Sequence, residues 1–263
     1  MPGRIWILAS ALLAALLCPV SADAPPRRVV SLAPSLTQMV VAAGASDRLV
    51  AVTPFCQASE KIPRLPGGLQ PEAEEVLGLE PDLVLATAMT PASTRQQLRN
   101  LGIRVEVLDA LSLADIRAAI TRVAQLLQSD TPPPAGAARY APTQSAVLLF
   151  GADTSYSAGC GTHAHEILEA AGLRNIAAAA GGPWPQLGEE VLLAADPEII
   201  IVADYGNTDR AQVLETLRRH PVRRHLAAVR EGRVLIFPAS AFSVPGPAAL
   251  EAGEALRAEV QKL

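Results

Sequence analysis

The feature that most constrains the fold of this chain is an internal repeat. The segments EEVLGLEPDLVLA (74–86) and EVLLAADPEIIIVA (190–203) match when Pro81 is aligned with Pro197. In this register Glu74 is aligned with Glu190, 116 residues further along the chain. Each copy begins with an acidic residue, continues as a helical pattern to the proline, and ends in a short apolar strand. A repeat of this kind predicts two similar structural units.

Short apolar runs alternate with helical patterns through both halves. The predicted strands are 28–34, 48–55, 82–88 and 103–110 in the first half, and 146–152, 198–205 and 233–240 in the second. The predicted helices are 35–44, 72–79, 91–102, 112–128, 163–172, 189–196, 210–220 and about 248–262. This alternation predicts an α/β fold with mostly parallel sheets, arranged as two α/β lobes.

The predicted organisation has four parts. They are a signal peptide (1–22), an N-terminal lobe (27–111), a linking helix with a Pro-rich loop (112–144), and a C-terminal lobe with the terminal helix (145–263). The amphipathic helix in the linking part is the expected spine between the lobes. Ser35 and Gln38 have the spacing of a helix capping box. Gly44 and Gly102 are predicted helix stops.

The first residues have the pattern of an export signal. Arg4 precedes an apolar run, 5–17, and small residues stand before Asp23. Thirteen residues are too few to span a bilayer comfortably. Cleavage after Ala22 is favoured over lipid attachment at Cys18, because Leu17 is bulky. The expected location is therefore the periplasm.

Composition excludes some functions. After loss of residues 1–22 the formal charge is −5, whereas nucleic-acid binding favours a basic surface. Half of the residues are hydrophobic, which supplies a large core. Aromatic residues make up only 3% of the chain, so their positions are informative.

At the repeat and its flanks, the sequence resembles the periplasmic substrate-binding proteins of ABC importers for cobalamin, iron-siderophores and haem. The resemblance runs from RRVVSLAPSLTQMVVAAGASDRLVAVT (27–53) to the terminal helix. The segment GGPWPQLGEEVLLAADPEIIIV (181–202) is most similar to the cobalamin-binding branch. The resemblance implies two lobes on one spine helix, with ligand in the cleft between them. It implies no catalysis and no cofactor, and contact with the membrane only through a permease.

The resemblance also implies a role for the repeated acids. In the family, one glutamate on each lobe docks on arginines of the two-fold symmetric transmembrane dimer of the ABC transporter. Glu74 and Glu190 occupy these places. Paired charges of this kind set orientation and association rate. The alternative is that both only favour the first turn of a helix.

Ligands in open α/β sheets bind beyond the carboxyl ends of the strands. The predicted ligand-binding residues are Pro34, Ser35, Phe55, Cys56, Cys160, Trp184 and Phe242. Trp184 stands between two prolines on a loop, which favours ligand contact over a place in the core. Small or apolar residues stand at Gly68, Thr87 and Val244, where the cobalamin branch has tryptophans and a basic side chain. The predicted ligand is a corrinoid such as cobalamin; the alternatives are an iron-siderophore, haem or another metal chelate.

Two cysteines and two histidines form an unusual group. A disulfide is the default for an even pair in an exported protein. Cys56 and Cys160 follow strands of different lobes, however, so a disulfide would join the lobes across the cleft. Free, bridged and ligand-contacting cysteines all remain open. His163 and His165 are two residues apart and point in different directions on a helix, so no metal site is predicted.

An exported enzyme is the alternative from another class. Gly159 to Ala164 fit the G-x-G-x-x-A form of a dinucleotide fingerprint, but the strand before them ends too early and the expected acid is missing. Cys160 and His163 could form a nucleophile and base, but no acid is suggested to orient the histidine. The sequence therefore favours a binding protein.

Overall fold

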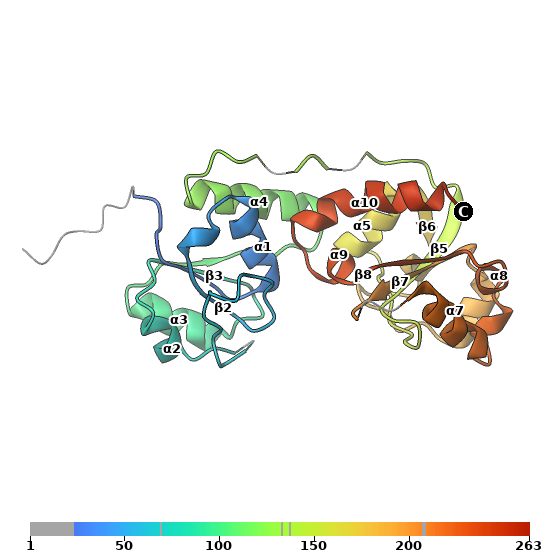
Figure 1. Cartoon of the computed structure of the whole chain (residues 1–263), viewed down its shortest axis with the longest axis horizontal. Helices are drawn as coiled ribbons and strands as arrows, with labels where there is room; N and C mark the ends of the chain where they lie inside the picture. The colour runs from blue at the N-terminus through green and yellow to red at the C-terminus, as the bar shows by residue number, and fades with distance from the viewer. Residues whose placement is uncertain (1–23, 69, 133, 137, 207–208) are drawn as a thin grey trace, which may run out of the picture.

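The protein consists of two α/β lobes placed side by side, with helices along one edge (Figure 1). The structure, a computed structural model, describes residues 24–68, 70–132, 134–136, 138–206 and 209–263. The predicted signal peptide, 1–22, lies outside these residues. None of the helices in the described ranges combines the length and apolarity needed to span a bilayer.

Each lobe is built on a four-stranded parallel sheet. The N-terminal sheet has the order β2-β1-β3-β4 and the C-terminal sheet the order β6-β5-β7-β8, which is the same topology twice. The strands are β1 (Val29–Ser31), β2 (Leu49–Val52), β3 (Leu83–Ala86), β4 (Val105–Val107), β5 (Gln144–Leu149), β6 (Leu173–Asn175), β7 (Ile199–Asp204) and β8 (Val234–Pro238). The predicted α/β fold class is confirmed.

The helices cover the sheets and connect the lobes. They are α1 (Pro34–Ala42), α2 (Ala73–Leu77), α3 (Ala92–Asn100), α4 (Leu113–Leu126), α5 (His163–Ala170), α6 (Glu189–Ala195), α7 (Arg210–Arg219), α8 (Ala227–Arg230), α9 (Ser240–Ser243) and α10 (Pro247–Val260). Short 3-10 turns lie at η1 (Ser46–Arg48), η2 (Ile176–Ala179) and η3 (Arg223–His225).

The sequence repeat has a structural counterpart. Helices α2 and α6 begin at Ala73 and Glu189, and strands β3 and β7 begin at Leu83 and Ile199. Both pairs are separated by the same 116 residues that separate Glu74 from Glu190. Each of these glutamates is therefore the second residue of a short helix that leads into the central strand of its lobe.

Helix α4 ties the lobes together. Its first backbone N–H, at Leu113, donates to the Glu166 carboxylate of α5 at 2.7 Å. Its other end lies on the N-terminal lobe, where Arg48 donates to the Leu127 carbonyl at 2.7 Å. The described residues of 129–143 then run back along the same edge of the molecule to β5 (Figure 1).

The two lobes share one hydrophobic core along this edge. Buried side chains of α1, α4, α5 and α10 belong to a single cluster, for example Met39, Ile120, Ile167 and Leu256. Two smaller clusters cover the other face of each sheet. Since close-packed cores resist deformation, we expect this shared core to limit relative movement of the lobes.

Some local predictions were wrong. Helix α1 begins at Pro34 with Ala33 as its N-cap, so Ser35 is not a cap; the capping box in this structure is Ser112 with Asp115 on α4. The short edge strand β6 was not predicted. The helix stops at Gly44 and Gly102 are confirmed, since both have positive φ angles.

Candidate functional site

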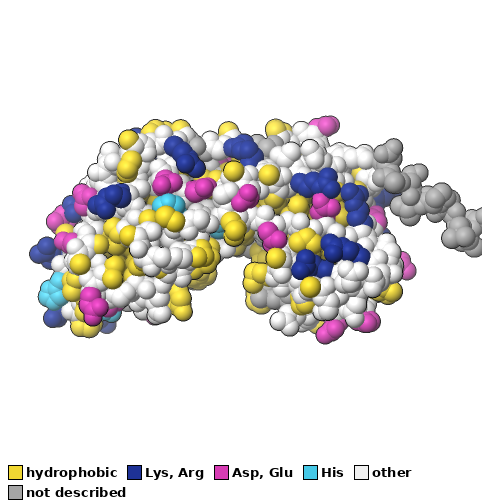
Figure 2. Space-filling view, turned by 180° about the vertical axis from the view of Figure 1, so that it is seen from behind, with side chains coloured by type: hydrophobic (Ala, Val, Ile, Leu, Met, Phe, Trp, Pro, Cys, Tyr) yellow, Lys and Arg dark blue, Asp and Glu magenta, His cyan; other side chains and the backbone are white. Residues whose placement is uncertain are grey.

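A cleft lies between the two lobes. Its volume is about 770 Å³, and it opens beyond the carboxyl ends of β2, β7 and β8. Figure 2 shows it as a notch between the lobes with hydrophobic side chains on both walls. This is the position that parallel α/β sheets offer to ligands.

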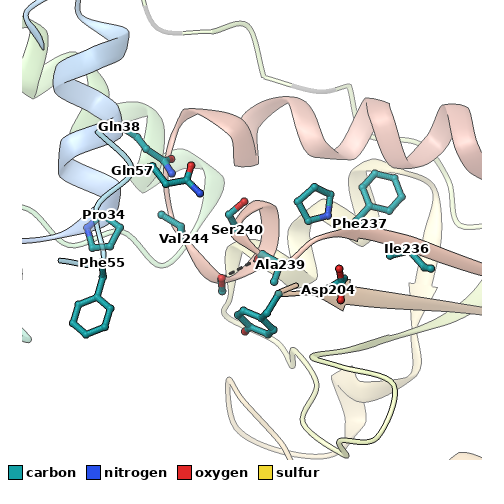
Figure 3. A pocket seen from close by; sticks show the side chains of 13 residues that line it. Pro34, Gln38, Phe55, Gln57, Asp204, Ile236, Phe237, Ala239, Ser240 and Val244 are labelled. Atoms are coloured by element: carbon teal, nitrogen blue, oxygen red, sulfur yellow. Dashed lines mark hydrogen bonds between the residues drawn. The ribbon is translucent and has the colours of Figure 1, made fainter. Parts of the chain in front are cut away.

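The N-terminal lobe contributes two pairs of residues to the cleft. Pro34 and Gln38 lie one turn apart on α1, and Phe55 and Gln57 follow β2. The Phe55 side chain is 60% exposed, which is unusual for a ring of this size. Figure 3 shows these four side chains on one side of the hollow.

The C-terminal lobe contributes the opposite wall. It is formed by the end of β7, the end of β8 and helix α9, and its residues are Asp204, Tyr205, Ile236, Phe237, Pro238, Ala239, Ser240, Ser243 and Val244. Tyr205 is 70% exposed. The Ser243 hydroxyl donates to the Ala239 carbonyl of the same helix, so its hydrogen bond is satisfied locally (Figure 3).

Trp184 lines a second hollow that continues the cleft along the C-terminal lobe. This hollow has a volume of about 420 Å³ and shares Tyr205 and Ser243 with the cleft. The Trp184 ring is 45% exposed. It packs edge-to-face against Phe150, with ring centroids 5.7 Å apart, and against His163 at 6.3 Å. Two aromatic neighbours thus hold a large ring at the surface.

A ladder of backbone hydrogen bonds fixes the Trp184 loop. The N–H groups of Ser157, Gly159 and Leu187 donate to the carbonyls of Pro185, Pro183 and Ser155 respectively. A Cβ on Gly159 would lie 2.2 Å from the carbonyl oxygen of Gly182, so only glycine permits this close approach. Gly159 therefore serves packing of the loop, in place of the dinucleotide contact that the sequence pattern suggested.

His163 is a buried, neutral imidazole behind Trp184. Burial lowers its pKa to about 4, and a hydrogen bond from the ring to the Phe242 carbonyl opposes this shift. Its Nε2 atom has no hydrogen-bond partner among the described residues. Because a carbonyl only accepts, the proton is on Nδ1 and Nε2 carries a lone pair.

The predicted ligand residues divide into three groups. Pro34 and Phe55 line the cleft, and Trp184 lines the adjoining hollow. Ser35, Cys56 and Phe242 are buried behind the surface; Phe242 has no exposed area and packs on Phe237. Cys160 does not line either hollow.

Cys160 lies instead beside a separate hollow on the C-terminal lobe. Its Sγ atom is 3.9 Å from Nε2 of His165 and donates to the Ala178 carbonyl. Both cysteines are free, and Cys56 Sγ contacts the Thr53 hydroxyl at 3.1 Å. The default disulfide is thus not formed.

The nucleophile–base pair of Cys160 and His163, considered under the enzyme alternative, is not formed either, because the neighbouring histidine is His165. Asn175 donates from Nδ2 to the Ala158 carbonyl and lies 3.1 Å from Nδ1 of His165. Since Asn175 Oδ1 accepts from Ala177, its amide orientation is fixed and His165 must accept at Nδ1. The proton is then on Nε2, so this nitrogen is not a base for the thiol. Within the described residues, no three His, Cys, Asp or Glu side chains are arranged to hold a metal.

The sequence-based list of ligand-binding residues omits several residues that line the cleft, including Gln38 and Gln57. Gln38 is four residues after Pro34 on α1, so helical spacing alone would have placed it on the same face. Gly68 and Val244 lie at the site as the resemblance implied: a Cβ on Gly68 would be 3.7 Å from the Phe55 ring, and Val244 lines the cleft. The small residue at 68 leaves the Phe55 ring open to solvent.

The repeated glutamates lie on exposed surfaces away from these hollows. Glu74 and Glu190 are exposed, and neither has an ion-pair partner among the described residues. Three residues after each, Leu77 and Leu193 are 39% and 43% exposed. Residues three apart share a helix face. Each lobe therefore presents one carboxylate and one leucine, in the same register of the repeat.

The neighbouring Glu189 has a different environment. It pairs with the buried Arg223 guanidinium at 2.7 Å. Arg223 also donates to the Ala152 carbonyl at 2.7 Å and to the Ser155 hydroxyl at 3.3 Å. This network ties the start of α6 to the loop after β5.

Comparison with known proteins agrees with this architecture. Residues 29–131 and 134–241 match the family model described as periplasmic binding protein. The chain belongs to this family, whose members bind solutes.

Relatives and solved structures of this family resemble the chain over most of its length. A protein of Pectobacterium carotovorum named vitamin B12-binding protein is 30% identical over 76% of this chain and 79% of its own length. A periplasmic haem-binding protein of Pseudomonas aeruginosa is 26% identical, with a TM-score of 0.70 over 89% of this chain and 92% of its own. A periplasmic vitamin B12-binding protein of Vibrio cholerae is 22% identical, with a TM-score of 0.68 over 90% and 98%.

Proposed function

We propose that this protein is a periplasmic receptor that delivers a corrinoid, such as cobalamin, to the permease of an ABC transporter. The observation that carries the proposal is the cleft of about 770 Å³ with exposed aromatic side chains, Phe55 and Tyr205, on its opposite walls. A flat macrocycle is bound well by rigid apolar surfaces of this kind. The 30% identical relative named vitamin B12-binding protein supports the ligand class. Export through residues 1–22 is part of the proposal.

The ligand contacts that we propose are Pro34, Phe55 and Trp184, with Tyr205 added from the structure. Ser35, Cys56 and Phe242 support these residues from behind, since all three are buried. Cys160 is not included, because it lines neither the cleft nor the adjoining hollow. The protein performs no chemistry on the ligand, so specificity comes from the shape of the cleft.

A ferric chelate such as haem is the second candidate. Tyr156 and Tyr205 both line the hollow beside Trp184 and are exposed. A tyrosine phenolate can ligate haem iron. The haem-binding protein of Pseudomonas aeruginosa, which is 26% identical to this chain, supports this candidate.

Titration with candidate ligands tests the proposal. The exported protein contains one tryptophan, Trp184, because Trp6 belongs to the signal segment. We expect cyanocobalamin to quench Trp184 fluorescence at micromolar or lower concentration, and Phe55→Ala to weaken binding by about tenfold, the effect of losing one aromatic contact. Saturable binding of haemin or a ferric siderophore, without binding of cyanocobalamin, would replace the corrinoid proposal by the second candidate.

We also propose that Glu74 and Glu190 dock on the transmembrane dimer. Two carboxylates in equivalent positions of two lobes suit a two-fold symmetric partner with two basic pockets. Leu77 and Leu193, three residues on, add an apolar contact beside each charge. The match of charge and leucine at one repeat offset favours docking over a role in helix stability alone.

A double substitution tests docking. We expect Glu74→Ala with Glu190→Ala to reduce import to background while ligand affinity changes less than about twofold, since neither residue lines the cleft. The matched control is Glu251→Ala with Glu254→Ala, which removes the same charge from exposed positions on α10. Docking is ruled out if the first pair imports as well as the control, or loses ligand affinity in proportion to import.

A further inference from the structure

Two buried polar atoms without hydrogen-bond partners belong to residues beside Trp184. Ser157 lines the same hollow as Trp184 and has no exposed area, yet its hydroxyl oxygen contacts no polar atom. His163 packs edge-to-face on the Trp184 ring, and its Nε2 atom likewise has no hydrogen-bond partner. Among the described residues, only Glu75, on α2, has another such atom. Two of the three atoms thus belong to residues next to Trp184, one lining its hollow and one packed against its ring.

Unpaired buried polar atoms are unfavourable and uncommon in folded proteins. The side chains around this pair are mainly aromatic, with Phe150, Tyr156 and Trp184 in the same wall. The unsatisfied pair at the edge of a binding cleft therefore indicates a site whose partner arrives with the ligand.

The two atoms define a hydrogen-bonding pattern. His163 offers a lone pair at Nε2, because its Nδ1 proton is directed to the Phe242 carbonyl. Burial keeps the ring neutral, with a pKa of about 4, so it does not attract an anion. The Ser157 hydroxyl is able to donate. The complementary group has one donor and one acceptor and no charge.

We infer that Ser157 and His163 form a recessed polar subsite that binds an uncharged carboxamide of the ligand, beside the Trp184 ring. The amide NH₂ donates to His163 Nε2 and the amide carbonyl accepts from the Ser157 hydroxyl. This inference rests on the proposed function, because it deepens the corrinoid assignment. Corrinoids of the cobalamin type carry several peripheral carboxamides, whereas haem carries carboxylates.

The subsite gives a physical basis for selectivity. A carboxylate in place of the amide would direct its negative charge at the lone pair of a neutral imidazole in an apolar wall. Burial of such a charge without a cation is strongly unfavourable. Access requires the Trp184 ring to move aside, and rotamer changes of this kind are common on binding.

Cobalamin and its monocarboxylic acids, in which one amide has been hydrolysed, are suitable probes. In calorimetric titrations of the exported protein we expect cyanocobalamin to bind. We expect at least one monocarboxylic acid to bind about tenfold more weakly or worse, because a carboxylate cannot donate to His163.

Single substitutions distinguish the loss of a ligand contact from a general loss of protein stability. We expect Ser157→Ala to weaken cyanocobalamin binding by about threefold to tenfold, the net effect of one hydrogen bond. The same substitution should raise the melting temperature of the ligand-free protein by about 2–4 °C, because it removes an unpaired buried hydroxyl. A residue with only a structural role would not change affinity and stability in opposite directions.

Matched variants serve as controls. His163→Asn keeps a donor near the Nδ1 position and removes the acceptor at Nε2, whereas His163→Gln keeps a polar atom near the Nε2 position. We expect the Asn variant to bind more weakly than the Gln variant. Thr154→Val, in the same loop, should bind normally, since the Thr154 hydroxyl donates to the Phe150 carbonyl and the side chain is outside both hollows.

The outcomes distinguish the two proposals. If the wild type binds cyanocobalamin but Ser157→Ala and His163→Asn bind equally well, the subsite is refuted and the proposed function stands. If the variants weaken cyanocobalamin while every monocarboxylic acid binds the wild type as tightly as the parent, the amide assignment is refuted. Failure of the wild type to bind any corrinoid overturns the proposed function and the subsite together.

Discussion

At the scale of single residues, adjacent side chains in this protein have separate roles. Glu189 and Glu190 are neighbours at the start of α6, but only Glu189 pairs with the buried Arg223. Likewise His163 faces Trp184, whereas His165 contacts Cys160 and Asn175. Successive residues on a helix point about 100° apart, so neighbours in sequence reach different surroundings.

The two glutamates provide a direct test of this separation. We expect Glu189→Ala to lower the free energy of unfolding by about 3–5 kcal/mol, because it leaves the Arg223 charge buried and unpaired. Glu190→Ala should change it by less than about 0.5 kcal/mol, as is usual for exposed positions. Urea unfolding followed by circular dichroism measures both. If both substitutions lower the free energy of unfolding equally, the separate roles of Glu189 and Glu190 are contradicted.

At the scale of elements, α4 depends on a partner from the other lobe. Its capping box, Ser112 with Asp115, satisfies donors within the helix, and Glu166 of α5 accepts from the next N–H, at Leu113. A carboxylate near a helix N-terminus also interacts favourably with the helix dipole. The link between the lobes is therefore both a packing contact and a charged hydrogen bond.

Substitution of Glu166 tests the link. We expect Glu166→Ala to lower the free energy of unfolding by about 1–2 kcal/mol, which is the range for a lost helix cap. The melting temperature should then fall by about 2–8 °C. Glu166→Gln retains an acceptor for the Leu113 N–H, so its free energy of unfolding should fall by about half as much. A thermal melt of the two variants gives the comparison, and no difference from wild type in either would show that Leu113 is satisfied in another way.

At the scale of the whole molecule, one core runs along the shared edge of the lobes while the opposite edge is open. The cleft therefore opens where the clusters of the two lobes are separate, and the continuous cluster lies behind it. His163 is part of the wall between these regions, since its Phe242 partner belongs to the continuous core. The ionisation of His163 thus affects the stability of the entire fold.

The acid dependence of stability follows from the His163 pKa. Its pKa falls from 6.5 to about 4 on folding, so the unfolded chain takes up a proton first as pH decreases. Neutral His163 therefore stabilises the folded state fully above pH 6.5. This stabilisation is lost as the pH falls towards 4, which lowers the free energy of unfolding by about 3 kcal/mol. We expect the stability difference between wild type and His163→Asn to shrink by this amount between pH 7 and pH 4. If urea unfolding gives the same stability difference between the two proteins at every pH in this range, the lowered pKa of His163 is contradicted.

Much of the fold could be predicted from the sequence because it depends on local pattern. Buried parallel strands are short apolar runs, and seven of the eight strands in the described part of the chain were found in this way. Strand β6 was missed, since a three-residue edge strand such as Leu173–Asn175 is formed by pairing with β5 and has no apolar run of its own. The capping box at Ser35 was wrong because Pro34 already begins the helix.

The site was less accessible to sequence reasoning, since it depends on which side chains remain exposed. Position at a strand end selected Pro34 and Phe55, and a loop between two prolines selected Trp184; all three line the hollows. The same argument included Phe242 and Cys160, which are respectively buried and turned to another surface. Burial and direction depend on contacts between distant segments, and no local pattern encodes them.

The sequence by itself determined the duplicated α/β architecture and the positions of Glu74 and Glu190, because repeats and hydrophobic periodicity are properties of the chain. Only the tertiary structure decided that both glutamates are exposed beside a leucine, that Glu189 is paired, and that Ser157 and His163 are both buried beside Trp184. The physical reason is that burial, hydrogen-bond satisfaction and pKa are set by neighbours in space. Ser157 and His163 are close together in the sequence, but Trp184 lies 21 residues after His163 and is brought against them only by folding.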